Sequence, residues 1–592
     1  MSTCFPTYKH DVDFCVVGGG LSGLLAAVAA ARHGAKVALM QDRPMLGGNA
    51  SSEIRMWICG AHGPNMRETG ILEELNLNNH YRNPDKNYSV WDGILHELAI
   101  STPNLEMMYN CSCCDCGMDD SGKRIEWIRG WQTTTQQWHE VRAKIFADCS
   151  GDSILAPLTG AEYRYGRESR DEFDEPPMPE VADRRTMGMS CLMQARQEDR
   201  PSEFIPPAWA HKYTADDLPH RTPNMTHMGE NFWYIELGGE YDAIGDTEKL
   251  RDELLKITCG IWDYVKNAPE NKARNANWRL DWVGMLPGKR ESRRYVGDHI
   301  LCANEIRDGG HFDDLIAYGG WTMDNHHPAG FATDQPPTIY HPAPSPFGIP
   351  YRCLYSKNID NLMFAGRNIS VTHMACSACR VMATCGLLGQ AAGTAAAIAV
   401  EKGLTPRGVY EREINLLKQT LMDDDCYLPF NTRQVSELCK SAELICKADN
   451  AESLRSGVDR PIGSDTNRCA VSKGEVIEYR WTEPRRISSV RITFDSDFNC
   501  ETLPPYEQVM QRGMLANRPL NLPDTYVPKT IVRAYRIDAV KSNGETVTLV
   551  EVDDNHQRLC KHNVSVEALA VRLIPLDTWG SEVCGLFAFD VA

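Results

Sequence analysis

Two adjacent histidines, His326 and His327, follow an aspartate at position 324 in a segment typical of a loop. Imidazole and carboxylate groups at this spacing suit the transfer of a proton near neutral pH. They also suit a metal ion, which needs a third or fourth ligand that Asp324 would have to supply. We interpret one of the two histidines as an acid–base group and assign no metal site; ordinary polar contacts are the alternative.

A second candidate is a cationic stretch at residues 286–294, which holds four cations and one carboxylate within nine residues. The Pro-Gly pair near its start predicts a turn. Such a cluster is typical of a clamp for an anionic group, with Arg290 as the candidate catalytic residue and Arg293 as a further cation. A solvated loop or a salt-bridged scaffold is the alternative.

The chain has 22 cysteines, and four of them lie at Cys111, Cys113, Cys114 and Cys116. One- and two-residue spacings without a second pair nearby are a poor match to a metal or iron–sulfur site. We therefore expect small apolar thiols on a strand. Cys376 and the next cysteine, three residues on, could form a redox pair, but no thioredoxin-like strand precedes them.

The strongest motif begins with an apolar run at residues 13–17, followed at once by six residues with GxGxxG spacing and an alanine-rich helix up to residue 33. Strand, tight turn and helix in this order predict a dinucleotide-binding unit. Gly18 would make the turn, Gly20 would let the backbone approach a pyrophosphate, and Gly23 would let the helix pack on the strand. The helix N-terminus would then face the phosphates, Leu21 and Ser22 included.

Residues 36–40 supply the expected second strand, after which an acidic residue should bind the ribose hydroxyls. The sequence has Gln41 there and Asp42 one place later. The Gln41 amide can bond a hydroxyl, and Asp42 takes the role if the strand ends one residue later.

Three further stretches resemble the FAD-dependent oxidoreductases of the glutathione-reductase and fumarate-reductase superfamily. They are residues 43–53 with a glycine pair, residues 144–152 at a strand end, and residues 361–367 before a helix expected at 377–400. Cys149 and Ser150 replace the common alanine and threonine of that family. The resemblance spans residues 13–395, and the segments 380–384 and 389–393 add to it.

The resemblance implies that FAD is the cofactor and that the later helix points its positive end at the flavin ring. It also makes His373, between the third strand and that helix, a candidate catalytic base or flavin contact, with covalent attachment or helix capping as alternatives. The implied cofactor-binding residues are Gly18, Gly20, Leu21, Ser22, Gly23, Gln41, Asp42, Arg43, Gly47, Gly48, Asn49, Ser51, Gly151, Asp152, Gly366, Arg367, Arg380, Thr384 and Gly386.

The predicted fold class is α/β: a Rossmann-like FAD-binding domain with an inserted α+β substrate domain and a C-terminal antiparallel β-sandwich. We place the first part of the FAD domain at 1–165, the insert at 166–345, the second part at 346–427 and the sandwich at 428–592. The insert should contain a strand at 232–237 and a helix at 247–267. Short alternating runs from residue 476 onward predict the sandwich, which weakly resembles galactose-binding jelly rolls.

A net charge of −18 argues against binding to nucleic acid or to an anionic membrane. The apolar stretches at 24–31 and 391–400 are shorter than a bilayer requires, and no signal peptide is apparent. We therefore expect a cytoplasmic protein with a small-molecule substrate and an undetermined electron acceptor, with a homo-oligomer left open.

Three functions remain open from the sequence. The first is hydride transfer from a polar hydroxylated molecule, a sugar or glycoside being suggested by the sandwich and the aromatic insert. The second is reduction of an activated C=C bond in a carboxylate substrate held by Arg290 or Arg293. The third is a flavin-containing binding or scaffold protein.

Overall fold

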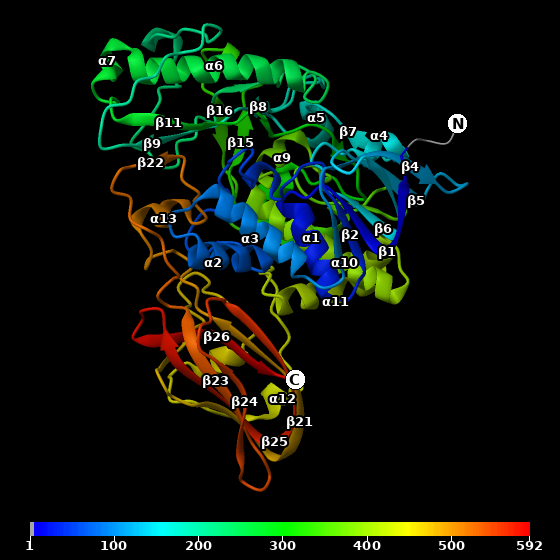
Figure 1. The fold of residues 1–592 in the computed structure, drawn as a ribbon. Helices are drawn as coiled ribbons and strands as arrows, with labels where there is room; N and C mark the ends of the chain where they lie inside the picture. The colour runs from blue at the N-terminus through cyan, green and yellow to red at the C-terminus, as the bar shows by residue number, and fades with distance from the viewer. Residues whose placement is uncertain (1–4) are drawn as a thin grey trace. The chain divides into compact units, whose positions relative to one another are not determined.

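The computed structural model describes residues 5–592 and divides into two compact units (Figure 1). Unit 1 holds the residues up to 62 together with 86–417 and 512–523, and unit 2 holds 63–85, 418–511 and 524–592. Residues 63–85, which come early in the sequence, thus cluster with the C-terminal part of the chain. The division into four domains stays a prediction.

A parallel sheet forms the centre of unit 1, as the α/β pattern predicts. Its order is β3-β2-β1-β6-β18, and β18, from far along the chain, pairs with the C-terminal half of β6. The N-terminal half of β6 pairs instead with the antiparallel hairpin β4–β5, so the four early cysteines lie on a strand. The bounds are β1 (Thr7–Val17), β2 (Val37–Met40), β3 (Leu105–Met108), β4 (Cys111–Met118), β5 (Ile125–Gln132), β6 (Gln137–Asp148) and β18 (Leu362–Phe364).

Helices α1 (Leu21–Arg32) and α10 (Met382–Lys402) pack against each other beside this sheet (Figure 1). A Cβ added at Gly389 would lie 2.0 Å from the Ser22 carbonyl oxygen, so only glycine permits this approach. By length and composition α10 could cross a membrane, yet 94% of its most apolar 18-residue window is buried inside the protein.

The single helix expected at 377–400 is two helices, α9 (His373–Cys379) and α10. Arg380 ends the first, and Val381 has extended dihedrals, φ −65° and ψ 144°, before the second begins. The break exposes the N-terminus of α10, and the Arg380 side chain bonds outward to Asp324. Sequence alone missed the break because neither glycine nor proline marks it.

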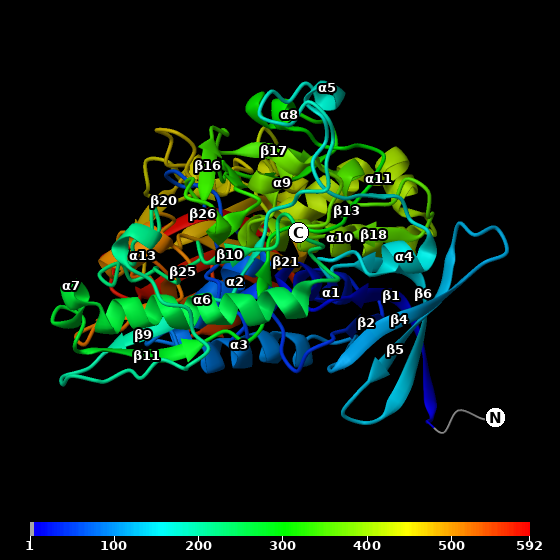
Figure 2. The same cartoon turned by 90° about the horizontal axis from the view of Figure 1, so that it is seen from above.

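The inserted segment is built on α6 (Thr247–Asn267), where the sequence predicts a helix with the same bounds; Figure 2 shows it running along the outside of unit 1. Its apolar face packs on a core that includes Met193, Phe232 and Trp262. The strand expected at 232–237 is reduced to β10 (Glu236–Leu237). The reason is a turn: Phe232 has a φ of 61°, and its carbonyl accepts a bond from the Ile235 amide.

The remaining elements of unit 1 connect these parts. They are α3 (Tyr88–Ile100), α4 (Leu155–Thr159), β7 (Tyr163–Arg164), α5 (Arg170–Phe173), β8 (Met189–Ser190), β9 (Met193–Gln197), α7 (Pro269–Lys272), β11 (Trp278–Val283), β12 (Gly288–Lys289), β13 (Arg294–Tyr295), α8 (Ala303–Arg307), β14 (Leu315–Gly319), β15 (Met323–His326), β16 (Thr338–His341), β17 (Phe347–Pro350) and β22 (Asn517–Arg518). Helix α11 (Pro406–Asp423) begins in unit 1 and ends in unit 2.

Unit 2 is an antiparallel sheet of order β20-β26-β21-β25-β23-β24, with β19 also pairing with β21. The alternating pattern predicts separate strands at 476–481 and 487–494, but these runs form one long strand, β21, whose pairing with β25 is interrupted between Arg480 and Arg485. The sheet encloses an apolar core. The bounds are α2 (Ile71–Arg82), α12 (Glu437–Ser441), β19 (Glu443–Ile445), β20 (Cys469–Ser472), β21 (Ile477–Phe494), α13 (Pro505–Met510), β23 (Val532–Val540), β24 (Thr546–Val552), β25 (Leu559–Thr578) and β26 (Val583–Val591).

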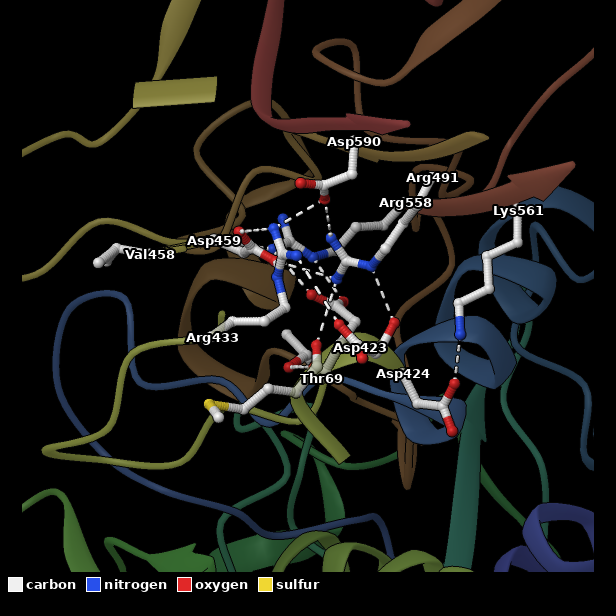
Figure 3. A network of polar contacts seen from close by, with 12 residues as sticks. Thr69, Asp423, Asp424, Arg433, Val458, Asp459, Arg491, Arg558, Lys561 and Asp590 are labelled. Atoms are coloured by element: carbon white, nitrogen blue, oxygen red, sulfur yellow. Dashed lines mark hydrogen bonds and ion pairs between the residues drawn. The ribbon is translucent and has the colours of Figure 1, made fainter. Parts of the chain in front are cut away.

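Buried charges lie at one end of this sheet (Figure 3). Asp459 accepts from Arg433 and Arg491 at 3.0 and 2.9 Å, and both arginines also pair with Asp590, at 2.8 and 3.3 Å. Arg558 pairs with Asp425 at 2.7 Å. We call these six residues the closed network, because the cavity beside them has a volume of only about 30 Å³, enough for one water molecule.

Candidate functional site

A cavity of about 620 Å³ opens in unit 1 where the carboxyl ends of β1, β2 and β6 meet the inserted segment. Ligands of open α/β sheets bind at such strand ends. Most of the predicted cofactor residues line it, and Arg290 lines it too. The predicted residues in the wall are Gly18, Gly20, Leu21, Ser22, Gln41, Asp42, Arg43, Gly47, Gly48, Asn49, Gly151, Asp152, Gly366, Arg367, Arg380 and Arg290.

The other predicted residues lie behind the wall. Gly23 packs against the Gly18 carbonyl, and the Ser51 hydroxyl donates to the Gly48 carbonyl at 2.7 Å, which shapes the glycine-pair turn. Thr384 and Gly386 are buried within α10. These residues support the cavity without lining it.

The glycine loop holds its shape through the residue that replaces the usual acid. Gly18 turns the chain with a φ of 97°. The Gln41 amide oxygen then accepts from the Gly19 N–H at 2.6 Å, and its nitrogen donates to the Met45 carbonyl at 2.9 Å. The Gln41 side chain is thus already engaged in joining the Gly19 loop to the Met45 loop. The more exposed Asp42 is therefore the better placed group for a ribose hydroxyl.

Asp152 fixes two cations at the middle of the cavity. Its carboxylate accepts from Lys289 and Arg367, both at 2.7 Å, and from the Ser292 hydroxyl at 2.8 Å. Burial favours the neutral acid, but Arg367 and Lys289 outweigh burial and hold the pKa of Asp152 well below its usual range. Asp152 is therefore a permanent anion that positions these side chains.

At the far end of the cavity, Arg290 enters from the cationic stretch. Its guanidinium donates to the Ser190 hydroxyl at 2.9 Å and to the Trp233 carbonyl at 2.8 Å. It also lies 3.5 Å from the Glu236 carboxylate, which is buried. Arg290 is thus held rigidly with its charge close to the cavity surface.

His326 connects Glu236 to a second arginine. Its Nδ1 lies 2.6 Å from Glu236, its Nε2 lies 3.1 Å from Asp324, and Asp324 in turn pairs with Arg380 at 3.1 Å. Burial raises the pKa values of both carboxyls, yet the nearby cations outweigh it, chiefly Arg290 for Glu236 and His326 for Asp324, so both pKa values are lowered. We call these five residues, from Arg290 through Glu236, His326 and Asp324 to Arg380, the cavity network.

None of the three predicted histidines, His326, His327 and His373, lines the cavity wall. The His327 Nδ1 accepts from the Ala329 N–H at 3.2 Å, and burial lowers the pKa of His327. His373 is fully buried, with Nδ1 2.8 Å from Glu291 and Nε2 3.1 Å from the Asn325 side chain. His373 lies outside the wall because the chain breaks between α9 and α10. The cavity is lined by the start of α10 and not by α9, which carries His373.

Sequence reasoning missed Glu236 and weighed Asp324 only as a metal ligand. An acid inside the apolar run 232–237 was the available sign for Glu236. It also missed that cysteines line the cavity, namely Cys59, Cys111, Cys113, Cys149 and Cys385. Among residues 5–592 no group of three or more His, Cys, Asp or Glu side chains is arranged so that it could hold a metal ion.

A family model described as FAD dependent oxidoreductase matches residues 13–421. The chain belongs to the FAD-dependent oxidoreductase family. It is therefore an enzyme of this class, and FAD is its cofactor. No curated protein matches the chain.

Solved structures resemble parts of this FAD-dependent oxidoreductase at low identity. A geranylgeranyl bacteriochlorophyll reductase-like protein from Thermoplasma acidophilum is 13% identical and covers 71% of this chain and 85% of its own, with a TM-score of 0.33. The family 32 carbohydrate-binding module of Streptococcus pneumoniae EndoD is 13% identical and covers 26% of this chain and 99% of its own, with a TM-score of 0.20. We base no conclusion on matches at these TM-scores.

The cavity itself fits FAD. Helix α1 begins at Gly20 without a side-chain cap, so its first N–H groups are free to meet a pyrophosphate. Five cations and three carboxylates line the wall, which suits a dianion. The Nε atoms of Arg367 and Arg380 are buried and have no hydrogen-bond partner in the described part of the chain. Buried donors of this kind require an acceptor, which a bound cofactor or substrate provides.

Proposed function

We propose that this oxidoreductase exchanges a hydride with a small polar substrate that carries a carboxylate or a similar anionic group. Bound FAD supplies the hydride acceptor or donor. The chain's own residues bind the anion, exclude water and move the proton that accompanies the hydride. The observation that supports this proposal is the charge of the cavity network.

The protonation of His326 decides that charge. Both ring nitrogens lie against carboxylate oxygens, and an ionised carboxylate only accepts hydrogen bonds, so both contacts are satisfied when each nitrogen carries a proton. Three cations then face two carboxylates, and the network carries one net positive charge. Because Arg290 and Arg380 reach the cavity surface, that charge attracts an anionic group there.

The leading candidate reaction is oxidation of a hydroxylated acid, sugar acids included. The hydroxyl proton would pass to a carboxylate of the cavity network while the hydride leaves the carbon that bears the hydroxyl. Ser190 supports a hydroxylated substrate, because its side chain lines the same end of the cavity as Arg290.

The second candidate is reduction of an activated C=C bond in a carboxylate substrate. It is favoured by the absence of histidine from the cavity wall within residues 5–592, which leaves the cations there, Lys289, Arg290 and Arg380 among them, as candidate proton donors. If Arg290 or Arg380 donates the proton, Glu236 and Asp324 would relay a proton from solvent back to it.

Anaerobic spectra of the FAD-loaded enzyme test both candidates. The oxidised enzyme is mixed with hydroxy acids, sugar acids and their neutral amides, and the reduced enzyme with enoic acids and matching neutral enones. Bleaching by acids alone supports oxidation, and recovery of the oxidised spectrum by enoic acids alone supports reduction. Equal rates with neutral partners would contradict the anionic group, and no response to any compound would contradict the proposed function.

A further inference from the structure

Two cysteines of unit 2 bring their sulfur atoms to within 3.9 Å of each other. Cys446 directly follows β19, and Cys469 is the first residue of β20. A disulfide has a sulfur–sulfur distance of about 2 Å, so a movement of roughly 2 Å would join them. Neither residue takes part in the proposed flavin reaction.

The two thiols differ in access to solvent. Cys469 is fully buried, whereas Cys446 is partly exposed. A small oxidant can therefore reach the Cys446 sulfur, whereas the Cys469 sulfur is shielded from solvent. This is the arrangement of an attacking cysteine and a resolving cysteine.

The surroundings of Cys446, the more accessible of the two cysteines, also favour its thiolate form. The hydrogen bond between the two sulfur atoms outweighs burial and the nearby Glu475 carboxylate, so the pKa of Cys446 falls to about 7. The N–H groups of Ala448 and Lys447 add to this effect, and the pKa of Cys469 rises. Cys114 provides a contrast, since it is exposed but burial of its sulfur raises its pKa.

We propose that Cys446 and Cys469 form a reversible disulfide, with Cys446 as the attacking thiol and a hydroperoxide as the oxidant. The Cys446 thiolate attacks the terminal peroxide oxygen, the O–O bond breaks, and sulfenic acid forms together with an alkoxide, or with hydroxide when the oxidant is hydrogen peroxide. The Cys469 thiol then attacks the sulfenic sulfur, water leaves, and the S–S bond closes. Two electrons pass from the thiols to the peroxide, and a dithiol reductant reverses the change.

The bond would close a loop, residues 447–468, that supplies Asp459 to the closed network (Figure 3). The cross-link restricts the conformations open to the unfolded chain and thereby stabilises the folded unit relative to it. We therefore expect oxidation to raise the unfolding temperature of unit 2 by several degrees.

The test treats the full-length FAD-loaded enzyme with limited hydrogen peroxide at pH 7 and maps peptides without reduction. We expect a peptide pair linked through Cys446 and Cys469, formed more than about tenfold faster than Cys114 is oxidised, because more thiolate is present. In Cys469→Ser a dimedone adduct should collect on Cys446, and in Cys446→Ser the link should be lost. Cys584→Ser, which removes another buried thiol of unit 2, should leave the link unchanged.

Three results would overturn the proposal. They are oxidation of Cys446 in the wild-type enzyme beyond the sulfenic acid without a link, a link from Cys446 to another cysteine or another molecule, and oxidation of Cys446 no faster than that of Cys114. Peptide mapping of the wild-type enzyme gives each answer even if the Cys469 variant fails to fold.

Discussion

The cavity network of unit 1 and the closed network of unit 2 are built from the same residue types but differ in what they leave open. In the closed network each arginine is held by carboxylates or backbone carbonyls, beside a cavity that holds one water molecule. In the cavity network, Arg290 and Arg380 border a space of about 620 Å³, and the Arg380 Nε has no partner in the described chain.

The difference shows how a buried charge can be interpreted. Where every donor already has an acceptor and no space remains, the charges serve the fold. Where donors face a cavity and the network has a net positive charge, the charges can bind a ligand. We therefore expect substitutions in the closed network to change stability and substitutions in the cavity network to change catalysis.

The largest effect is expected from Arg558→Met in the closed network. The change leaves Asp425 buried without its partner, and breaking a buried ion pair costs about 3–5 kcal/mol. Denaturant unfolding of the full chain measures the loss. Arg486→Met, at an exposed position on β21, is the matched control and should cost under about 0.5 kcal/mol. A loss of that small size for Arg558→Met would remove the distinction between the two networks.

Arg380→Gln and Arg290→Gln should lower kcat/KM by roughly 10- to 100-fold, because each removes a charge-assisted bond worth about 1.5–3 kcal/mol. Steady-state kinetics with an acid identified by the spectral panel measures this. The flavin reduction potential separates two roles, since an arginine that binds substrate raises KM, whereas one that faces the flavin shifts the potential. Arg279→Gln, on an exposed part of β11, should change neither.

His326→Gln should have a smaller effect that depends on pH. Without the imidazolium, Glu236 and Asp324 lose a neutralising charge, so their lowered pKa values rise. Protonation then begins at a higher pH, and the acidic limb of the kcat/KM profile should move upward in pH. An unchanged profile would show that His326 does not hold the carboxylates ionised.

The smallest effect concerns acid stability. Burial raises the pKa of Asp459, but Arg491 and Arg433 outweigh burial and the net shift is downward. Its contribution to stability is therefore full above the unfolded pKa of about 4 and is lost as pH falls through the folded value. The free energy of unfolding can be measured at several pH values from about 5 to about 2. Its slope against pH should be smaller for Asp459→Asn than for the wild type. An equal slope would contradict the ionised state of Asp459.

The local pattern of the chain was enough to predict the cofactor end of the cavity. The glycine loop, the two strands and helix α1 lie within one short segment, and each turn there requires a residue type that the sequence displays. The pattern also predicted α6 and the strands of unit 2, because a period of 3.6 or 2 residues records which face is buried. The break at Arg380 was missed, since tertiary contacts to Asp324 stabilise it and no local residue does.

The sequence by itself determined that this chain folds around a dinucleotide, because glycine spacing and strand–helix order are local properties. Only the tertiary structure decided which charges form the cavity network. Glu236, Arg290, Asp324 and Arg380 come from four separate segments, and their pairing depends on packing between distant parts of the chain. The same packing left His373 behind the wall, at a place that its position before the helix could not reveal.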